Sequence, residues 1–253
     1  MKEHDLIKSL VVSLLIIGFS PLYTSPSNAA GTVTDNFDGA TINTRLWQPF
    51  EESTQTHLAQ QGGELRIKID GGSIDHGAGV SSKFLLKGNF VMTVDYRLIT
   101  WPNENGVRLG FEGGGSSNSD PGVMVKRISL GPNELPPPSN PKEVYSADFF
   151  DGSNWYGFRQ LATDIAGQGG SLRLDRVGSV MYGYYSTQPN TWVPIGSHDY
   201  GGKLEEWVGM TIWAIGNPPA GQNVEIAFDN FQVTYDQIKY ISTPVSIDLL
   251  LLD

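Results

Sequence analysis

Alternation between apolar and polar side chains is the feature that most limits how this chain can fold. It is clearest between Ser171 and Val233, in the runs SLRLDRVGSVMYGYYS, WVGMTIWAIG and VEIAFDNFQV. A period of two is typical of β-strands, because successive side chains point to opposite faces of a sheet. Val177-Gly178-Ser179 predicts a tight hairpin turn between the first two strands. The residues predicted to face a core here are Leu172, Leu174, Met181 and Tyr185, and those predicted to face away are Arg173, Asp175, Tyr182 and Tyr184.

The preceding part of the chain has the same character. Strand-like runs recur at short intervals, among them TVTDNF, NFVMTVDYRLIT, GVRLGFEG and WYGFRQL. Thirty glycines and fifteen prolines supply the turns that many short strands require. We found no useful stretch with a helical period, so the pattern predicts an all-β fold, a two-sheet antiparallel sandwich. We expect one domain over residues 30–236 and a C-terminal tail over residues 237–253.

The order of these features resembles the concanavalin A-like lectin and glucanase superfamily. The C-terminal half has a strand, a glycine turn, a Tyr-rich strand, Trp192 and Pro194, a returning strand, and a final strand with Phe-Asp-Asn-Phe at 228–231. The resemblance is greatest to bacterial laminarin-G-like and uncharacterised extracellular jelly rolls, and it implies a jelly-roll sandwich. It leaves the activity open, since the superfamily includes lectins, hydrolases, lyases and structural modules.

The first 29 residues are predicted to be a signal peptide. Ser9 to Phe19 is an apolar run long enough for the core of a signal peptide and too short to span a bilayer. Ser27 and Ala29 place small side chains before a cleavage site. We therefore expect a secreted protein, extracellular or periplasmic, with no membrane span after cleavage. The alternative is a leader that stays attached as a membrane anchor.

Composition excludes several classes of function. The formal net charge is −10, with no basic cluster, so nucleic acid and anionic membranes are poor partners. The chain has no cysteine, which excludes thiol nucleophiles, cysteine zinc sites and dithiol redox chemistry. Absence of cysteine from an exported chain also favours a bacterial source.

Familiar catalytic patterns are missing. Laminarinase-type glucanases of the superfamily place two carboxyl groups on one strand in a Glu-x-Asp-x-x-Glu pattern, which this sequence lacks. In the acidic segment EVYSADFFD, Glu143 and Asp148 should fall on opposite strand faces, and Asp148 is expected to be a hydrogen-bonded structural residue. The histidines have no metal-binding spacing, and no Gly-x-Ser-x-Gly motif is present. These observations favour a protein without catalytic activity.

Charged and aromatic side chains opposite the apolar set predict a ligand-binding surface. If their strands share one sheet, they form a groove in which aromatic rings stack on sugar faces and Arg–Asp pairs bind hydroxyl groups. The predicted ligand-binding residues are Asp95, Arg97, Arg108, Trp155, Arg159, Arg173, Asp175 and Tyr184, with Tyr182 and Trp213 also at the edge. The alternative is an exposed sheet face with ordinary cross-strand ion pairs.

A structural Ca²⁺ site is predicted where the two ends of the domain meet. In jelly rolls of related appearance the first and last strands are neighbours, which would bring Asp38 and Asp229 together. Their carboxylates and nearby backbone carbonyls are the oxygen ligands that Ca²⁺ prefers. The alternative is that both aspartates simply form turns.

The sequence thus predicts an exported, non-catalytic carbohydrate-binding protein of the lectin type. Two alternatives stay open: a polysaccharide-degrading hydrolase or lyase, and a structural protein of the cell surface or matrix. The residues predicted to form the core are Phe37, Trp47, Leu65, Val94, Tyr96, Leu109, Phe111, Leu172, Leu174, Phe228 and Phe231.

Overall fold

The computed structural model describes residues 30–72, 75–115, 120–130, 143–161, 169–189, 191–203 and 207–242. These residues form fifteen strands and no helix, as the alternation predicted. Accordingly, they contain no helix long and apolar enough to cross a membrane. The predicted signal peptide at 1–29 and the end of the predicted tail lie outside the described residues.

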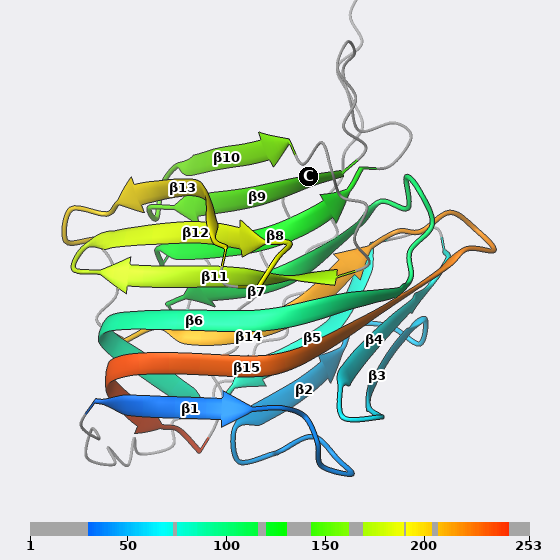
Figure 1. The fold of residues 1–253 in the computed structure, drawn as a ribbon, viewed down its shortest axis with the longest axis horizontal. Helices are drawn as coiled ribbons and strands as arrows, with labels where there is room; N and C mark the ends of the chain where they lie inside the picture. Colours follow the sequence, from blue (N-terminus) through cyan, green and yellow to red (C-terminus); the bar gives the residue numbers. More distant parts are fainter. Residues whose placement is uncertain are drawn as a thin grey trace, which may run out of the picture.

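One of the two sheets has eight strands. Their order is β13-β12-β11-β6-β15-β4-β3, with β1 also beside β15, and all pairs are antiparallel. In Figure 1 this sheet lies in front, with β6 and β15 side by side across the middle. The bounds are β1 Gly31–Asp35, β3 Thr56–Gln60, β4 Leu65–Asp70, β6 Phe84–Thr100, β11 Gly169–Val177, β12 Val180–Ser186, β13 Val193–Asp199 and β15 Asn223–Tyr240.

The other sheet has seven strands and lies behind the first (Figure 1). Its order is β10-β9-β8-β7-β14-β5-β2, again antiparallel throughout. The bounds are β2 Trp47–Glu51, β5 His76–Ser82, β7 Val107–Gly114, β8 Gly122–Ser129, β9 Glu143–Phe150, β10 Trp155–Leu161 and β14 Gly209–Gly216.

The main core fills the space between the sheets. Every second residue of each strand points inward, as in other sandwiches of two stacked sheets. Each predicted core residue is buried, which confirms the predicted strand faces: Phe37, Trp47, Leu65, Val94, Tyr96, Leu109, Phe111, Leu172, Leu174, Phe228 and Phe231.

The two ends of the domain are neighbours, as predicted. Strand β1 pairs with β15, and Asp35 lies opposite Phe231. The Trp47 indole packs edge-on against Phe231 with ring centroids 4.9 Å apart, and its Nε1–H donates to Asp35 Oδ2 at 2.9 Å. Strand β15 continues to Tyr240, so the sandwich extends past the expected boundary at residue 236.

The chain changes sheets several times, and this determines which strands share a face. The predicted hairpin at Val177-Gly178-Ser179 is present, with Val177 opposite Val180 and both strands in the eight-stranded sheet. By contrast, β6 and β7 belong to different sheets although they are consecutive, and so do β10 and β11. Outward-pointing residues of consecutive strands can therefore lie on opposite sides of the molecule.

Candidate functional site

The prediction of a single groove is wrong. Five of the eight predicted ligand-binding residues lie on the outer face of the eight-stranded sheet: Asp95, Arg97, Arg173, Asp175 and Tyr184. The other three come from the seven-stranded sheet: Arg108 and Trp155 lie on its outer face, and Arg159 belongs to its strand β10. Tyr182 and Trp213, predicted to edge the same groove, are separated in the same way. The physical reason is that alternation fixes the face of each strand but not the sheet that the strand joins.

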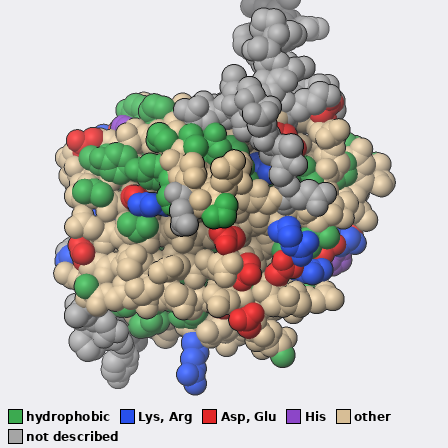
Figure 2. All heavy atoms as spheres, viewed as in Figure 1, with side chains coloured by type: hydrophobic (Ala, Val, Ile, Leu, Met, Phe, Trp, Pro, Cys, Tyr) green, Lys and Arg blue, Asp and Glu red, His purple; other side chains and the backbone are tan. Residues whose placement is uncertain are grey.

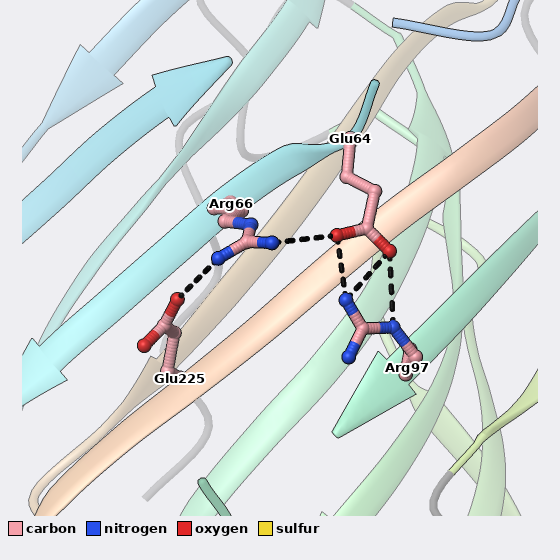
Figure 3. Close-up of polar contacts among 4 residues, drawn as sticks. All are labelled: Glu64, Arg66, Arg97 and Glu225. Atoms are coloured by element: carbon pink, nitrogen blue, oxygen red, sulfur yellow. Dashed lines mark hydrogen bonds and ion pairs between the residues drawn. The ribbon is translucent and has the colours of Figure 1, made fainter. Parts of the chain in front are cut away.

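Arg97 takes part in an ion-pair network rather than facing a ligand. Its guanidinium binds the Glu64 carboxylate through Nε at 3.0 Å and through one terminal nitrogen at 2.8 and 2.7 Å (Figure 3). Arg66 joins Glu64 at 3.1 Å to Glu225 at 3.3 Å in the same network. The hydrogen bonds that Glu64 accepts from Arg97 are the main reason that the pKa of Glu64 is lowered. This arrangement matches the alternative of ordinary cross-strand ion pairs.

Arg173 has a different environment. Arg97 lies opposite Gly169 of β11, and Arg173 is four residues, or about 13 Å, further along that strand. Asp175 accepts two hydrogen bonds from it, at 2.7 and 2.6 Å. The guanidinium carbon lies 5.3 Å from the centroid of the Tyr184 ring and 5.6 Å from that of Trp192. The rings of Tyr182 and Tyr184 are nearly parallel, with centroids 6.4 Å apart.

The outer face of the seven-stranded sheet carries its own hydrophobic cluster. Met124, Trp213 and Ile215 are buried there, and Phe50 and Trp155 pack against them from the two edge strands β2 and β10. Trp213 lies between a glycine on each neighbouring strand. Of the predicted residues on this face, Trp155 stacks on Phe150, Arg108 lies opposite Ile128, and Arg159 is placed only by its register opposite Ser146.

Two buried polar atoms on this face have no hydrogen-bond partner among the described residues. They are Oε2 of Glu112, whose residue is 3% exposed, and Nε1 of Trp213, which is 1% exposed. Glu112 lies directly opposite Thr211, two residues from Trp213 on the neighbouring strand β14. Buried polar groups in proteins are nearly always hydrogen-bonded, so two such atoms on adjacent strands of one face need an explanation.

A buried ion pair lies on the same face. Lys126 Nζ is 2.7 Å from Asp148 Oδ2, and Ser146 Oγ donates to Asp148 Oδ1 at 3.0 Å, so Asp148 is hydrogen-bonded as predicted. Burial raises the pKa of Glu112 to about 8, against the opposing effect of the Lys126 charge. At neutral pH, Glu112 is therefore an uncharged acid and hydrogen-bond donor close to a cation paired with a carboxylate.

The predicted calcium ligands lie in an acidic neighbourhood. Asp229 is opposite Asp95 and its Oδ1 accepts a hydrogen bond from the backbone of Asn230 at 2.6 Å. Burial raises the pKa of Asp229, and the negative charge of Asp38 is among the further causes. The two aspartates therefore interact. Among the described residues, no group of three or more acidic or histidine side chains is arranged to hold a metal, so backbone carbonyls would have to complete a calcium site.

Sequence reasoning identified strand faces but missed the residues that matter most on them. The alternation in GVRLGFEG points Glu112 outward, as the structure has it, but nothing in that run signals that one oxygen of its carboxyl is buried without a partner. Trp213 was placed at the edge of a groove and lies instead near the middle of the seven-stranded sheet. Trp192 contributed only to the resemblance, whereas its ring packs near Arg173.

Comparison with known proteins gives structural relatives only. No protein-family profile and no curated protein matches the sequence. The fold is similar to the catalytic domain of an endo-1,3-β-glucanase (laminarinase) from Thermotoga petrophila, with a TM-score of 0.59 and 10% identity over 82% of this chain and 98% of that one. Lectin I-B4 from Griffonia simplicifolia has a TM-score of 0.55 and 11% identity, over 80% and 98%.

A third structure is described as an immunostimulatory antigen and pseudo β-1,3-glucanase of Mycobacterium tuberculosis. It has a TM-score of 0.58 and 12% identity, over 80% of this chain and 98% of that one. At such low identity these likenesses concern the fold. Together with the two stacked antiparallel sheets, they show that the chain has the jelly-roll fold of the concanavalin A-like lectins and glucanases.

Proposed function

We propose that this protein binds carbohydrate on the outer face of its seven-stranded sheet. The observation that carries the proposal is the pair of unsatisfied polar atoms on this face, Glu112 Oε2 and the Nε1 of Trp213 in the aromatic cluster. A buried donor or acceptor left without a partner costs about 1–3 kcal/mol, and a ligand hydroxyl that displaces the side chains burying it and hydrogen-bonds to it removes this cost.

A sugar suits these groups better than a charged ligand does. Glu112 is uncharged at neutral pH, and the Lys126 charge is already paired with Asp148. Hydroxyl groups both donate and accept hydrogen bonds, while the C–H faces of a sugar pack on aromatic rings such as those of Trp155 and Phe50. The proposal is also supported by relatives of the same fold: one is a lectin, and another was crystallised in complex with laminaritriose and laminaritetraose.

A glycan array tests the proposal. Trp213→Phe removes the indole N–H and keeps an aromatic ring, and Glu112→Met removes both carboxyl oxygens and keeps a side chain of similar length. We expect wild type to bind and both variants to bind at least about tenfold more weakly, which corresponds to about 1.4 kcal/mol. Trp207→Phe is the matched control, because Trp207 lies elsewhere, near Lys87 and Lys239. Normal binding by both variants, or no binding of any glycan by wild type, would refute the proposal.

Glycoside cleavage is a second candidate function, favoured by one observation. Glu112 holds a proton at neutral pH, while Lys126 pairs with Asp148 on the same face. An uncharged acid and a carboxylate are the two groups that glycoside hydrolysis requires. Reducing-sugar release on the same glycan panel separates the candidates. Release that is lost in Glu112→Gln and Asp148→Asn supports cleavage, whereas binding without release supports a lectin-like role.

Export and calcium binding belong to the same proposal. Cleavage after Ala29 would leave Ala30, just before β1, as the first residue of the secreted protein. Asp38 and Asp229 would hold Ca²⁺ together with backbone oxygens, because a cation offsets the repulsion that contributes to the raised pKa of Asp229. N-terminal sequencing of the secreted protein tests the first point: a start at Ala30 supports it, and retention of residues 1–29 contradicts it.

A further inference from the structure

An aromatic patch lies on the opposite side of the molecule, on the outer face of the eight-stranded sheet. We define it as Tyr182 and Tyr184 of β12 and Trp192 before β13, together with Arg173 and Asp175 of β11. Figure 2 shows hydrophobic side chains gathered at the upper left of this face, with basic and acidic groups among them. The patch is remote from Glu112 and Trp213, which lie on the other sheet.

The positive charge within the patch, that of Arg173, is already paired with Asp175. Arg173 makes two hydrogen bonds to Asp175, which are the main reason that the Arg173 pKa is raised. Its guanidinium also lies over the rings of Tyr184 and Trp192. These contacts restrict the orientation of Trp192, and they leave no unbalanced positive charge on Arg173 for an anionic ligand.

A pocket of about 480 Å³ adjoins the patch. Trp192 lines it together with Asp95, Ser171 and Gln188, and Gly169 and Gly170 leave its β11 side without bulky side chains. Of the residues that the structure places around this pocket, Asp95 is the charged one. The pocket thus combines an aromatic ring, a carboxylate and uncharged polar groups.

The Asp95 carboxylate has neutral partners. Ser171 Oγ donates to Oδ1 at 2.5 Å and Asn230 Nδ2 donates to Oδ2 at 3.0 Å. Each carboxylate oxygen can accept more than one hydrogen bond, so capacity remains on both. Since both partners are neutral, no direct ion pair among the described residues balances this charge.

The surroundings of the pocket are negative as well. Asp229 lies opposite Asp95 on the neighbouring strand. Its pKa is raised chiefly by burial, and the charges of Asp38, Asp95 and Glu64 all contribute in the same direction. A cation that enters the pocket is therefore attracted, and an anionic sugar such as a uronate is repelled.

We propose that this pocket binds the protonated amine of an amino sugar, with the ammonium group against the Asp95 carboxylate and the sugar ring against Trp192. A carboxylate beside an aromatic ring is a favourable setting for an ammonium group, because both attract the charge. The polar groups of Ser171 and Gln188 are placed to meet sugar hydroxyls. This site goes beyond the proposed function, since it uses the other sheet and a different ligand chemistry.

Matched ligands test the inference by calorimetry. The probes are oligomers of glucosamine, the same oligomers fully N-acetylated, and a simple alkylamine. We expect the free-amine oligomer to bind at least about tenfold more tightly than the acetylated oligomer, which corresponds to about 1.4 kcal/mol. Tighter binding of the oligomer than of the alkylamine would show that the sugar ring contributes. Equal binding of the two oligomers overturns the inference. If the alkylamine binds as tightly as the free-amine oligomer, the site recognises amines in general and the assignment to amino sugars is wrong.

Variants then locate the site. Asp95→Asn removes the charge with little change of shape and should lower binding of the free-amine oligomer about tenfold, as expected for loss of a partly exposed charge interaction. Trp192→Ala should weaken binding of the oligomer more than that of the alkylamine. Glu225→Gln is the matched control, because it removes an acid that pairs with Arg66 on the same sheet outside the pocket. Melting temperatures establish that each variant is folded.

The two proposals fail independently. Trp213→Phe should leave binding of the free-amine oligomer unchanged, and Asp95→Asn should leave binding of glycans on the seven-stranded sheet unchanged. All binding measurements use one calcium-containing buffer, so that calcium occupancy at Asp38 and Asp229 is the same in each. An amine site that disappears with Trp213→Phe and persists in Asp95→Asn contradicts the inference.

Discussion

The phenol oxygens of Tyr96 and Tyr145 lie 2.6 Å apart in the interior of the sandwich. Tyr96 comes from β6 of one sheet and Tyr145 from β9 of the other, so this hydrogen bond joins the two sheets. The Tyr145 ring also stacks on Tyr185 of the opposite sheet, with centroids 3.9 Å apart. A terminal nitrogen of Arg127 donates to the Tyr96 hydroxyl at 3.1 Å, which brings a charge into the core.

The first prediction concerns the partner of this buried charge. Arg127 is 2% exposed, and its guanidinium lies 2.7 Å from Glu143, which also accepts a hydrogen bond from the Trp101 indole at 2.6 Å. Glu143→Ala should lower the free energy of unfolding by about 3–5 kcal/mol, because it removes the partner of a buried charge. Urea denaturation measures the change.

The network in Figure 3 supplies the control for this prediction. Glu225→Ala removes the partner of Arg66 at 3.3 Å on a more exposed part of the surface. We expect it to change the free energy of unfolding by less than about 1 kcal/mol, as exposed pairs usually do. Similar losses in the two variants would contradict the prediction that removing the partner of a buried charge costs more than breaking an exposed ion pair.

The second prediction concerns the end strand. Phe231 is 1% exposed and packs edge-on against Trp47, opposite the first strand. Phe231→Ala should lower the free energy of unfolding by about 3–5 kcal/mol through loss of buried surface and formation of a cavity. Val177→Ala is the control, since Val177 is 58% exposed and its truncation should change stability by less than about 0.5 kcal/mol.

The fold could be predicted because its signals are local. Alternation placed Val94 and Tyr96 inward on β6, and Leu172 and Leu174 inward on β11, and all four are buried. The turn residues at 177–179 fixed the register of β11 with β12. Strand alternation and turn residues depend only on neighbours in the sequence, so both can be recognised in a single amino-acid sequence.

The candidate site depends on long-range pairing, which the sequence does not display. Arg108 and Arg97 belong to consecutive strands but to different sheets. Glu112 points outward as its strand pattern requires, but its burial arises from side chains that other strands bring to the same face. Which strands are neighbours is decided by pairing between segments that are far apart in the sequence, as where Thr211 of β14 lies opposite Ser81 of β5.

The third prediction concerns calcium. If Asp38 and Asp229 hold Ca²⁺, a chelator should lower the melting temperature, because a ligand at one hundred times its Kd stabilises the folded state by about 2.7 kcal/mol. Asp229→Ala should abolish this dependence. Asp70→Ala should retain it, since Asp70 pairs with Lys68 and His57 instead. A melting temperature of wild type that is indifferent to chelator and to added calcium would exclude the site.

The last prediction follows from the protonation of Glu112. Its pKa is about 8 in the folded protein, compared with 4.5 ordinarily, and burial is the cause. Between these two values the folded chain holds a proton that the unfolded chain has released. The contribution of Glu112 to stability is therefore most favourable below about pH 4.5, declines as the pH rises, and is least favourable above about pH 8.

Comparison with Glu112→Gln isolates this effect, because glutamine resembles the uncharged acid at every pH. The two proteins should have nearly equal stability at the acidic end of the window. As the pH rises, wild type should lose stability relative to the variant by up to about 1.4 kcal/mol for each pH unit. Urea denaturation at a series of pH values measures the difference, in which the contributions of all other groups cancel. A constant difference across the window would mean that Glu112 is ionised in the folded protein, and glycan binding through an uncharged carboxyl would then be wrong as well.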